Sequence, residues 1–495
     1  MQSFLIYFTL MIIQLILRLP ERDNEIKTCQ NLVSQDELTT HIYALAADSM
    51  MGRGLGSKEL EKAAEYIGAQ FNKAGLSFPP GLNNYYQEVA IQSVEPPNAG
   101  EIRVDTMNWI CSSDFVVMQG DNTDREYPLM YLNFGMEADY EGADIRGKIL
   151  LVRAGEKEKQ DLMDVLQSVA QKREIAQRHG AAGLIELLPP VGISWSRISR
   201  YLSSGRKDIV NRNGGSIMHI WLNDEKEDIL AIVGKLSGLN AKVRITGLDR
   251  EDIISRNVIG IVEGKDRALK NEYIAVTAHY DHVGIGRPHD GDSIYNGARD
   301  NAVGAATLIM AAKYLKAAGT KRSVIFIACM GEEEGMLGSM WYVNNPVVPL
   351  EKTVYNLNTD GAGYNDTTLI TMVAPGRTTI DDLVEKAANS FGLSLGGDPA
   401  PEQMFYERSD NISFARKGIP AVNLSPGCSS MDSEIMKYYH MPGDEPESLN
   451  YNYLTRYIQS FCLSLKWLAD SPETPFWEEG DQYEKTGMSL YGSRP

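Results

Sequence analysis

The second half of the 495-residue chain alternates between apolar, strand-like runs and helix-like segments, and this alternation strongly constrains the fold. Runs such as YIAVTAH, SVIFIAC and PAVNLS are mostly apolar, which is typical of strands buried on both faces of a sheet. Helical patterns separate such runs at 302–316, 336–344, 378–391 and 450–469. Strands that alternate with helices predict an α/β fold with a mixed, mostly parallel sheet and helices on both faces.

The stretch from about 105 to 245 has a different texture. Short β-like runs, among them FVVMQG, KILLVRAG and SIMHIWLN, are separated by turn residues, with one helical stretch at 161–178. The stretch holds no convergent set of metal ligands or nucleophiles. Because a single core rarely exceeds about 250–300 residues, we interpret it as a separate, smaller, β-rich domain.

We therefore expect two folded units with a segment at each end. Residues 1–24 would be a signal peptide or anchor, and 471–495 a loosely held tail, because the tail is rich in Pro, Glu and Gly. Residues 25–105 and 246–470 would form the larger domain, and 106–245 the inserted one.

Two helices are expected before the insert, at 36–47 and 57–74. In the second, apolar residues recur at helical spacing from Leu60 to Phe71, and Gly75 is a natural stop. A GlyArgGly segment marks a loop between the two helices.

The first 17 residues, MQSFLIYFTLMIIQLIL, carry no charged side chain. A membrane-spanning helix needs about 20 apolar residues, so this stretch fits the core of a signal peptide better. We expect export to an extracytoplasmic location. An uncleaved anchor is the main alternative and would be the chain's only contact with a membrane; a buried N-terminal helix is the third.

Charge and cysteine content exclude several classes of function. The formal net charge is −18 and the basic residues form no cluster, so nucleic acid would be repelled. Five cysteines are scattered with no CxxC pair, which excludes a disulfide framework and a cysteine zinc knuckle. The sequence predicts no particular oligomeric state.

Five residues that could ligate a metal follow or lie near the predicted strands. Each has an ordinary explanation by itself: a HisXAsp sequence is common, an aspartate before a helix is favoured by the helix dipole, and a run of glutamates is usually solvated. Reactive residues of α/β sheets gather at the carboxyl ends of strands. Together the five supply two nitrogens and three carboxylates, which is a ligand set that zinc accepts, and one carboxylate can bridge two ions. They are His279, Asp300, Glu333, Asp360 and His440.

Neighbouring residues strengthen the prediction of a metal site. Three adjacent carboxylates, at 332–334, directly follow a core-like strand, and this is costly unless a positive charge lies between them. Asp281 stands two residues after His279, where its carboxylate can hydrogen-bond the second ring nitrogen of a ligating histidine. Asn301 is expected to cap the helix that begins near Ala302.

These segments resemble the M28 family of co-catalytic zinc peptidases, and they occur in the family's order. The early segment DSMMGRGLGSKELEKAAEYIGAQF is similar to the N-terminal part of this family, and the stretch from about 105 to 245 resembles the protease-associated (PA) domain inserted in many members. The segments that carry the resemblance are AHYDH (278–282), GARDNAVG (297–304), GEEEGMLGS (331–339), LNTDGAG (357–363), RSDNISFARKGIPA (408–421) and YYHMPGDEPE (438–447).

The resemblance implies a two-zinc aminopeptidase that hydrolyses the N-terminal peptide bond of peptides. By position in the family pattern, Asp300 would bridge the two ions. Asp360 would share one ion with His279, and Glu333 would share the other with His440.

The resemblance also assigns residues that are not ligands. Glu332 matches the general base, and Asp281 matches the residue that orients His279. Tyr439 matches a residue that stabilises the oxyanion in some members. A cis peptide bond after Asp300 is expected as well.

The chain departs from the family pattern at three positions. Arg299 stands where an acidic or apolar residue is more common, His282 where a small residue is usual, and Asn411 where a histidine is frequent. None of the three is an expected ligand, so they bear on the shape and specificity of the pocket. His282 and His289 could compete as ligands, although loop histidines are more often solvated.

Four alternative functions remain open at this stage. A glutaminyl cyclase would use one zinc on the same fold, and a carboxypeptidase would need a basic group such as Arg299 or Arg408 for the terminal carboxylate. GLSLG at 392–396 matches a serine-hydrolase elbow, but that motif follows a strand and this one follows a helix, so Gly392 is better interpreted as a helix stop. A metal-free, receptor-like binding protein would have lost its ligands. The insert would be either a lid or a structural support.

Overall fold

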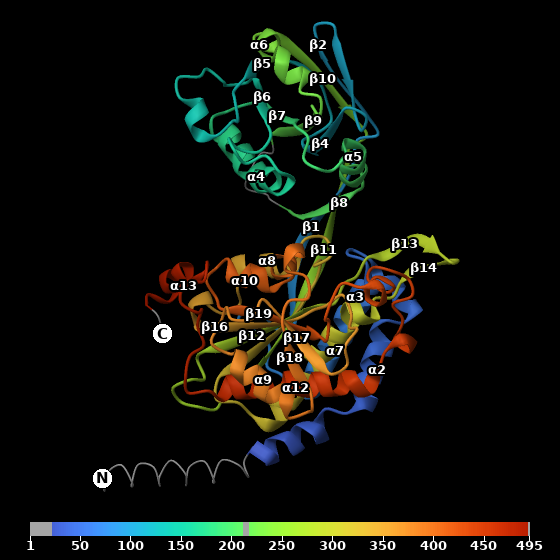
Figure 1. The fold of residues 1–495 in the computed structure, drawn as a ribbon, viewed down its shortest axis with the longest axis vertical. Coiled ribbons are helices and arrows are strands. Elements are labelled where there is room, and N and C mark those ends of the chain that lie inside the picture. The colour runs from blue at the N-terminus through green and yellow to red at the C-terminus, as the bar shows by residue number, and fades with distance from the viewer. Residues whose placement is uncertain (1–21, 211–216, 494–495) are drawn as a thin grey trace. The chain divides into compact units, whose positions relative to one another are not determined.

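The structure, a computed structural model, describes residues 22–210 and 217–493. The apolar leader lies outside these residues. No helix in the described part of the chain has the length and apolar character needed to cross a membrane. The described chain forms two compact units, one combining the segment up to Val89 with the segment from Ile254 onward, and the other running from Ala90 to Ile253 (Figure 1).

The larger unit is built on a mixed sheet with the strand order β18-β17-β19-β16-β12-β15-β11-β1. The pairs β12–β15, β12–β16, β16–β19 and β17–β18 are parallel, whereas β11–β15 and β17–β19 are antiparallel. Every residue of β15 and β16 is buried. Burial on both faces explains why β15 is almost entirely apolar, whereas β16 also buries Asn356 and Asn358. The strands are β1 (Tyr86–Glu95), β11 (Asp249–Val262), β12 (Tyr273–His279), β15 (Ser323–Cys329), β16 (Thr353–Thr359), β17 (Leu369–Val373), β18 (Ser394–Gly396) and β19 (Ala421–Pro426).

Helices cover both sides of this sheet (Figure 1). Side chains of β15 alternate between the two: Ile325 shares a core cluster with Tyr342 of α8 and Phe414 of α10, while the ring of Phe326 lies 6.3 Å from that of Phe71 in α3. The helices are α2 (Gln35–Leu45), α3 (Lys58–Ala74), α7 (Val303–Ala318), α8 (Leu337–Asn344), α9 (Asp381–Asn389), α10 (Asn411–Ala415), α11 (Ser433–Met436), α12 (Tyr451–Asp470) and α13 (Glu484–Tyr491).

Local sequence fixes the ends of these helices, as α3 and α7 show. The Ser57 hydroxyl accepts the N–H of Leu60 at 3.0 Å, and Gly75 ends α3 with φ 76°. Asn301 accepts the N–H of Gly304 at 2.9 Å, so the predicted capping residue does bond the first turn of α7.

The smaller unit contains a sheet of order β3-β2-β10-β5-β6-β7-β9-β4. It extends beyond 106–245 because β2 pairs with β10 and so belongs to the same sheet. Strand β8 (Arg206–Ile209) pairs with the end of β1. The elements are β2 (Ala99–Val104), β3 (Met107–Ile110), β4 (Phe115–Gln119), β5 (Thr123–Tyr131), β6 (Ile149–Arg153), α4 (Leu162–Arg178), β7 (Gly183–Leu188), α5 (Trp195–Leu202), β9 (Met218–Asn223), α6 (Asp228–Leu236) and β10 (Asn240–Thr246).

The expectation of a loosely held C-terminal tail is wrong. Phe476 is 3% exposed and Trp477 is fully buried in the core cluster that contains α8 and α10. Arg377 also pairs with Asp481 at 2.7 Å. The Pro, Glu and Gly content suggested mobility, but two aromatic side chains are enough to anchor this segment to the core.

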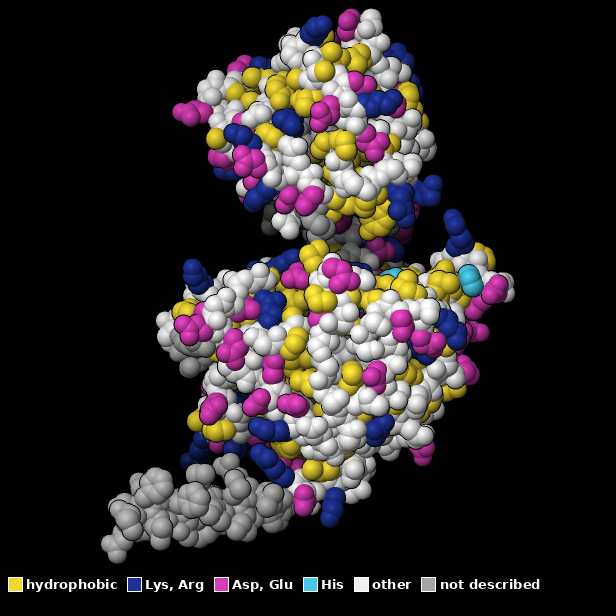
Figure 2. Space-filling model, viewed as in Figure 1, with side chains coloured by type: hydrophobic (Ala, Val, Ile, Leu, Met, Phe, Trp, Pro, Cys, Tyr) yellow, Lys and Arg dark blue, Asp and Glu magenta, His cyan; other side chains and the backbone are white. Residues whose placement is uncertain are grey.

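Charged side chains of both signs cover the molecular surface. On the face shown in Figure 2, Lys and Arg are interspersed with Asp and Glu. The acidic excess of the composition therefore does not appear on this face as one large acidic area.

Candidate metal centre

Strand ends and the loops after them position the five predicted ligands. His279 is the last residue of β12, Asp360 directly follows β16, and Glu333 lies in the loop after β15. Because β12 pairs in parallel with both β15 and β16, their carboxyl ends meet at one edge of the sheet. Asp300 precedes α7, and His440 lies between α11 and α12.

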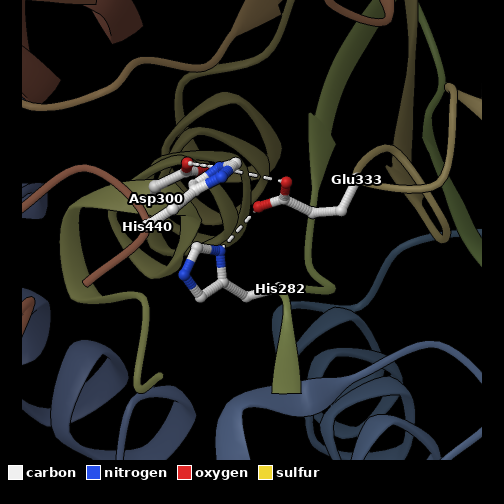
Figure 3. Close-up of side chains that lie close together, drawn as sticks. All are labelled: His282, Asp300, Glu333 and His440. Carbon is white, nitrogen blue, oxygen red and sulfur yellow. Dashed lines mark hydrogen bonds and ion pairs between the residues drawn. The ribbon is translucent and has the colours of Figure 1, made fainter. Parts of the chain in front are cut away.

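The five side chains form two groups that share Asp300. Nε2 of His279 lies 3.2 Å from Asp300 Oδ1 and 3.1 Å from Asp360 Oδ1. Nε2 of His440 lies 3.2 Å from Asp300 Oδ2 and 3.1 Å from Glu333 Oε2 (Figure 3). The two oxygens of Asp300 thus face different imidazoles, as a carboxylate that bridges two cations would.

The donor set fits two zinc ions. The carboxylates are largely withdrawn from water, with 7% of the Asp300 side chain exposed, 9% of Glu333 and 14% of Asp360. Buried carboxylates that lie this close together repel unless a positive charge is placed between them. Imidazole nitrogen and carboxylate oxygen are both accepted by zinc.

Two of the predicted ligands, Glu333 and His440, have pKa values far from their usual ranges. Burial and the charge of Asp300 would raise the pKa of Glu333, but hydrogen bonds from His282 and His440 hold that pKa at about 2. Burial would lower the pKa of His440, yet Asp300 and Glu333 raise it to about 10. A metal ion that binds Nε2 of His440 would therefore have to displace a proton.

Asp281 supports the loop that carries Glu332 and Glu333. Its Oδ1 accepts the N–H of Glu332 at 3.2 Å and its Oδ2 accepts the N–H of Glu333 at 3.3 Å. The ring Nδ1 of His279 lies 3.2 Å from the main-chain oxygen of Asp281 and 3.7 Å from its carboxylate. Asp281 is thus placed to orient His279 mainly through its carbonyl group.

Burial raises the pKa values of both Glu332 and Tyr439. Burial, together with the charges of Asp360 and Glu333, raises the pKa of Glu332 well above its usual value, against the opposing charge of His279. Burial also raises the pKa of Tyr439, whose ring stacks on that of His440 at 4.2 Å. The phenol therefore keeps its proton at neutral pH.

His282 also belongs to the group of potential ligands that contains Asp300, Glu333 and His440. The sequence alone left open whether this histidine is a ligand. It is 1% exposed, and its Nδ1 lies 2.6 Å from Glu333 Oε1. His289, the other histidine considered as a competing ligand, has 60% of its side chain exposed in the hairpin of β13 (Gly284–His289) and β14 (Asp292–Tyr295). The sequence feature that could have pointed to His282 is that it stands where a small residue is usual in the M28 pattern.

Asp444 and Arg299 join the loop of His440 to that of Asp300. Asp444 accepts the backbone N–H groups of Arg299 at 2.9 Å and Asp300 at 3.2 Å. The Arg299 guanidinium also pairs with Asp444 at 3.1 Å and lies 3.6 Å above the ring of Tyr438. Asp444 falls inside a segment that resembles the M28 family, although sequence alone gave it no role.

These contacts leave Arg299 a poor anchor for a substrate carboxylate. Its side chain is 5% exposed, and it also donates to the hydroxyl and the carbonyl oxygen of Ser448 at 2.5 and 2.9 Å. Arg408 is exposed and donates to the Tyr439 hydroxyl at 3.1 Å. The peptide bond after Asp300 is cis, as expected.

Arg53 is the other residue whose role the sequence did not reveal. It is fully buried in the segment expected to be a simple loop, and it donates to the main-chain oxygens of Tyr280 at 2.8 Å and Gly297 at 3.0 Å. The same guanidinium bonds the carbonyl groups of Leu45 and Asn296 at 2.6 and 2.7 Å. Arg53 thus ties the N-terminal segment to two loops that bear predicted ligands.

The serine-hydrolase interpretation has no structural support in this region. Gly392 follows α9 with φ 70°, as a residue that ends a helix does. Ser394 is exposed in the short strand β18.

Known proteins are similar to the larger unit in sequence and to most of the chain in fold. Residues 257–463 match the model of Peptidase family M28. Aminopeptidase YwaD of Bacillus subtilis (strain 168) is 25% identical over 270 residues, which cover 48% of this chain and 54% of that protein. Leucine aminopeptidase 2 of Trichophyton rubrum is 27% identical over 303 residues, 52% of this chain and 60% of that protein.

A solved structure agrees with the fold. The aminopeptidase from Aneurinibacillus sp. strain AM-1 superposes with a TM-score of 0.56 at 20% identity, over 91% of this chain and 97% of that one. The chain spans between half and two thirds of the length of the two sequence relatives. The similarity to peptidase family M28 thus spans residues 257–463, the segment that holds all five predicted metal ligands.

Proposed function

We propose that this protein is an aminopeptidase that hydrolyses the N-terminal peptide bond of peptides with the help of two zinc ions. The observation that carries the proposal is the pair of ligand groups that share Asp300, one facing His279 and the other facing His440. The sequence relatives described above are themselves named aminopeptidases.

In this proposal each zinc ion has its own residues. His279 and Asp360 would hold one ion, Glu333 and His440 would hold the other, and Asp300 would be shared by both. When bound, such a zinc pair lowers the pKa of a water molecule and polarises the scissile carbonyl group.

The chain's own groups then move the protons. Glu332 takes a proton from the attacking water on its carboxylate and delivers it to the leaving amine. Its raised pKa suits it to hold that proton between the two transfers. Tyr439 donates its hydroxyl proton in a hydrogen bond to the developing oxyanion.

The acidic character of the centre accounts for action at the N-terminus. A free α-amine is positively charged, and it would lie beside the carboxylates of Glu332, Asp360 and Asp300. A blocked N-terminus would lose this attraction. We therefore expect peptides with a free amine as substrates.

Hydrolysis rates on a panel of aminoacyl chromogenic substrates, measured with and without a chelator, test the activity. Elemental analysis should find two zinc ions per chain, whereas one ion would favour a cyclase-type centre. Glu332→Gln should keep both ions and lose turnover by about 10²–10⁴-fold. The exposed neighbour gives a matched control, Glu334→Gln, which should remain active. Full activity in Glu332→Gln, or in the presence of chelator, would contradict the proposal.

We also propose that the unit from Ala90 to Ile253 corresponds to the PA-like insert, and that the protein is exported. The first proposal is supported by the order of its strands and by its position in the sequence, between the two segments that form the larger unit. The apolar leader supports the second. Sequencing the N-terminus of the mature protein would show whether the leader is removed.

A further inference from the structure

The two carboxylate oxygens of Glu333 lie in different surroundings (Figure 3). Oε2 lies 3.1 Å from Nε2 of His440, on the side of Asp300. Oε1 lies 2.6 Å from Nδ1 of His282. One oxygen therefore faces the potential metal ligands, and the other is occupied by an imidazole that the proposed mechanism does not use.

The His282 ring is fixed in place from several sides. It is 1% exposed and meets the ring of His440 edge-on, with 5.4 Å between centroids. A Cβ atom at Gly297 would come within 2.6 Å of the His282 ring, so the backbone of that loop packs directly against it. The backbone N–H of His282 donates to the carbonyl oxygen of Arg53 at 3.3 Å.

The surroundings of the two ring nitrogens indicate where the proton lies. Nε2 of His282 is buried and has no hydrogen-bond partner among the described residues. A proton on Nε2 would be an unsatisfied buried donor, which costs more than leaving a lone pair there. A proton on Nδ1 instead points to Glu333 Oε1, at the short distance of a hydrogen bond to a carboxylate.

We propose that His282 is a positioning residue: its Nδ1–H holds Oε1 of Glu333 and so presents Oε2 as the single ligand atom beside His440. The inference rests on the proposed two-zinc function. A carboxylate that is fixed in this way cannot rotate between one-oxygen and two-oxygen binding. Hydrogen bonds to metal ligands of this kind typically contribute 10–100-fold to metal affinity.

The competing assignment is that His282 ligates the ion directly through Nδ1. Two substitutions separate the alternatives. His282→Ala removes both the donor and any ligand nitrogen. His282→Asn keeps an N–H donor near the position of Nδ1 but offers no imidazole nitrogen. His289→Ala, in the exposed hairpin, is the matched control.

Zinc dissociation constants, measured by competition with a chromophoric chelator, provide the main readout. In His282→Ala we expect the ion held by His279 and Asp360 to be unaffected and the ion held by Glu333 and His440 to bind about 10–100-fold more weakly. His282→Asn should restore most of that affinity, and His289→Ala should match the unmodified protein. The visible absorption of the cobalt-substituted protein should have the same shape in His282→Asn, because the ligands are unchanged.

Two results would overturn the inference while leaving the proposed function intact. One is unchanged zinc affinity in His282→Ala. The other is a His282→Asn variant that binds zinc as weakly as His282→Ala and has an altered cobalt spectrum, which would make His282 a ligand. If His282→Ala does not fold, as judged by circular dichroism, His282→Asn decides the question by itself. Failure of the unmodified protein to bind two ions or to cleave aminoacyl substrates would instead refute the proposed function.

Discussion

Each of the two units buries a charged cluster that contains carboxylate, one carboxylate in the smaller unit and several in the larger, and the two clusters have different partners. In the smaller unit, Glu186 is completely buried. Its carboxylate accepts hydrogen bonds from Lys172 Nζ at 2.8 Å and from His219 Nε2 at 2.7 Å. In the larger unit, the ion pairs of Asp300 and Glu333 within the described residues are with histidine rings, and none is with Lys or Arg.

This difference separates a structural cluster from one that is built to bind a cation. A buried carboxylate with its own ammonium group is neutral and offers little attraction to an added ion. A buried set of carboxylates whose ion pairs are with imidazoles can exchange protons for a metal. Buried charge alone is therefore a weak sign of function, and the type of partner decides between the two outcomes.

The largest effect should follow from removing the shared ligand of the larger unit. Asp300→Ala takes an oxygen from both proposed ions, and metal-assisted charge stabilisation amounts to several kcal/mol, so hydrolysis should fall by roughly 10³-fold or more. Rate measurements and zinc content per chain check this. Asp290→Ala, at the tip of the exposed hairpin, is the control and should change neither quantity.

The second effect should appear in the smaller unit as lost stability. Lys172→Met leaves Glu186 buried without its ammonium partner, which should lower the free energy of unfolding of this unit by about 3–5 kcal/mol. Chemical denaturation followed by tryptophan fluorescence measures it, with the exposed Lys226→Met as control. The zinc content of the folded protein should not change. The double variant Lys172→Met with Glu186→Gln should recover part of the lost free energy of unfolding. An unchanged free energy of unfolding in Lys172→Met alone would contradict the stated difference between the two units.

A third, smaller effect concerns pH. The pKa of His440 is raised to about 10 in the metal-free protein, so this ring is protonated near neutrality and zinc must displace its proton. Zinc affinity should therefore rise with pH, by about tenfold per pH unit for each proton released, up to the raised pKa. Calorimetry between pH 6 and 8, in buffers of different ionisation enthalpy, counts the protons. An affinity that is independent of pH would show that His440 does not release a proton.

The smallest effect should come from an exposed ion pair in the same unit as Lys172. Lys242 and Asp124 lie 3.5 Å apart with more than half of each side chain exposed. Lys242→Met should change the free energy of unfolding by less than about 1 kcal/mol, and less still at high salt. Denaturation at two salt concentrations measures this. A cost near that of Lys172→Met would mean that burial does not explain the difference.

The parts of the fold and site that sequence predicted depend on local pattern and strand order. The apolar run predicted β15 because a strand buried on both faces has no polar alternation. Parallel order then brings the ends of such strands to one edge, which is why His279, Glu333 and Asp360 could be grouped before their positions were known.

The remainder depends on contacts between segments that are distant in sequence. Arg53 gave no signal, because a charged residue between glycines normally lies in a solvated loop, and its acceptors are carbonyl groups that any residue can offer. The burial of His282 depends on packing by the Gly297 loop and by His440. Trp477 is buried for the same kind of reason, since its cluster draws on several strands and helices.

The bonds of Arg53 have a consequence for biosynthesis. Its guanidinium and the carbonyl group of Gly297 are 244 positions apart in sequence, and the whole smaller unit lies between them. A ribosome must therefore release that unit before the arginine can meet its acceptors. The last proposed ligand, at position 440, is synthesised 161 positions after the first, at 279. The proposed hydrolytic centre thus cannot assemble before position 440 has left the ribosome.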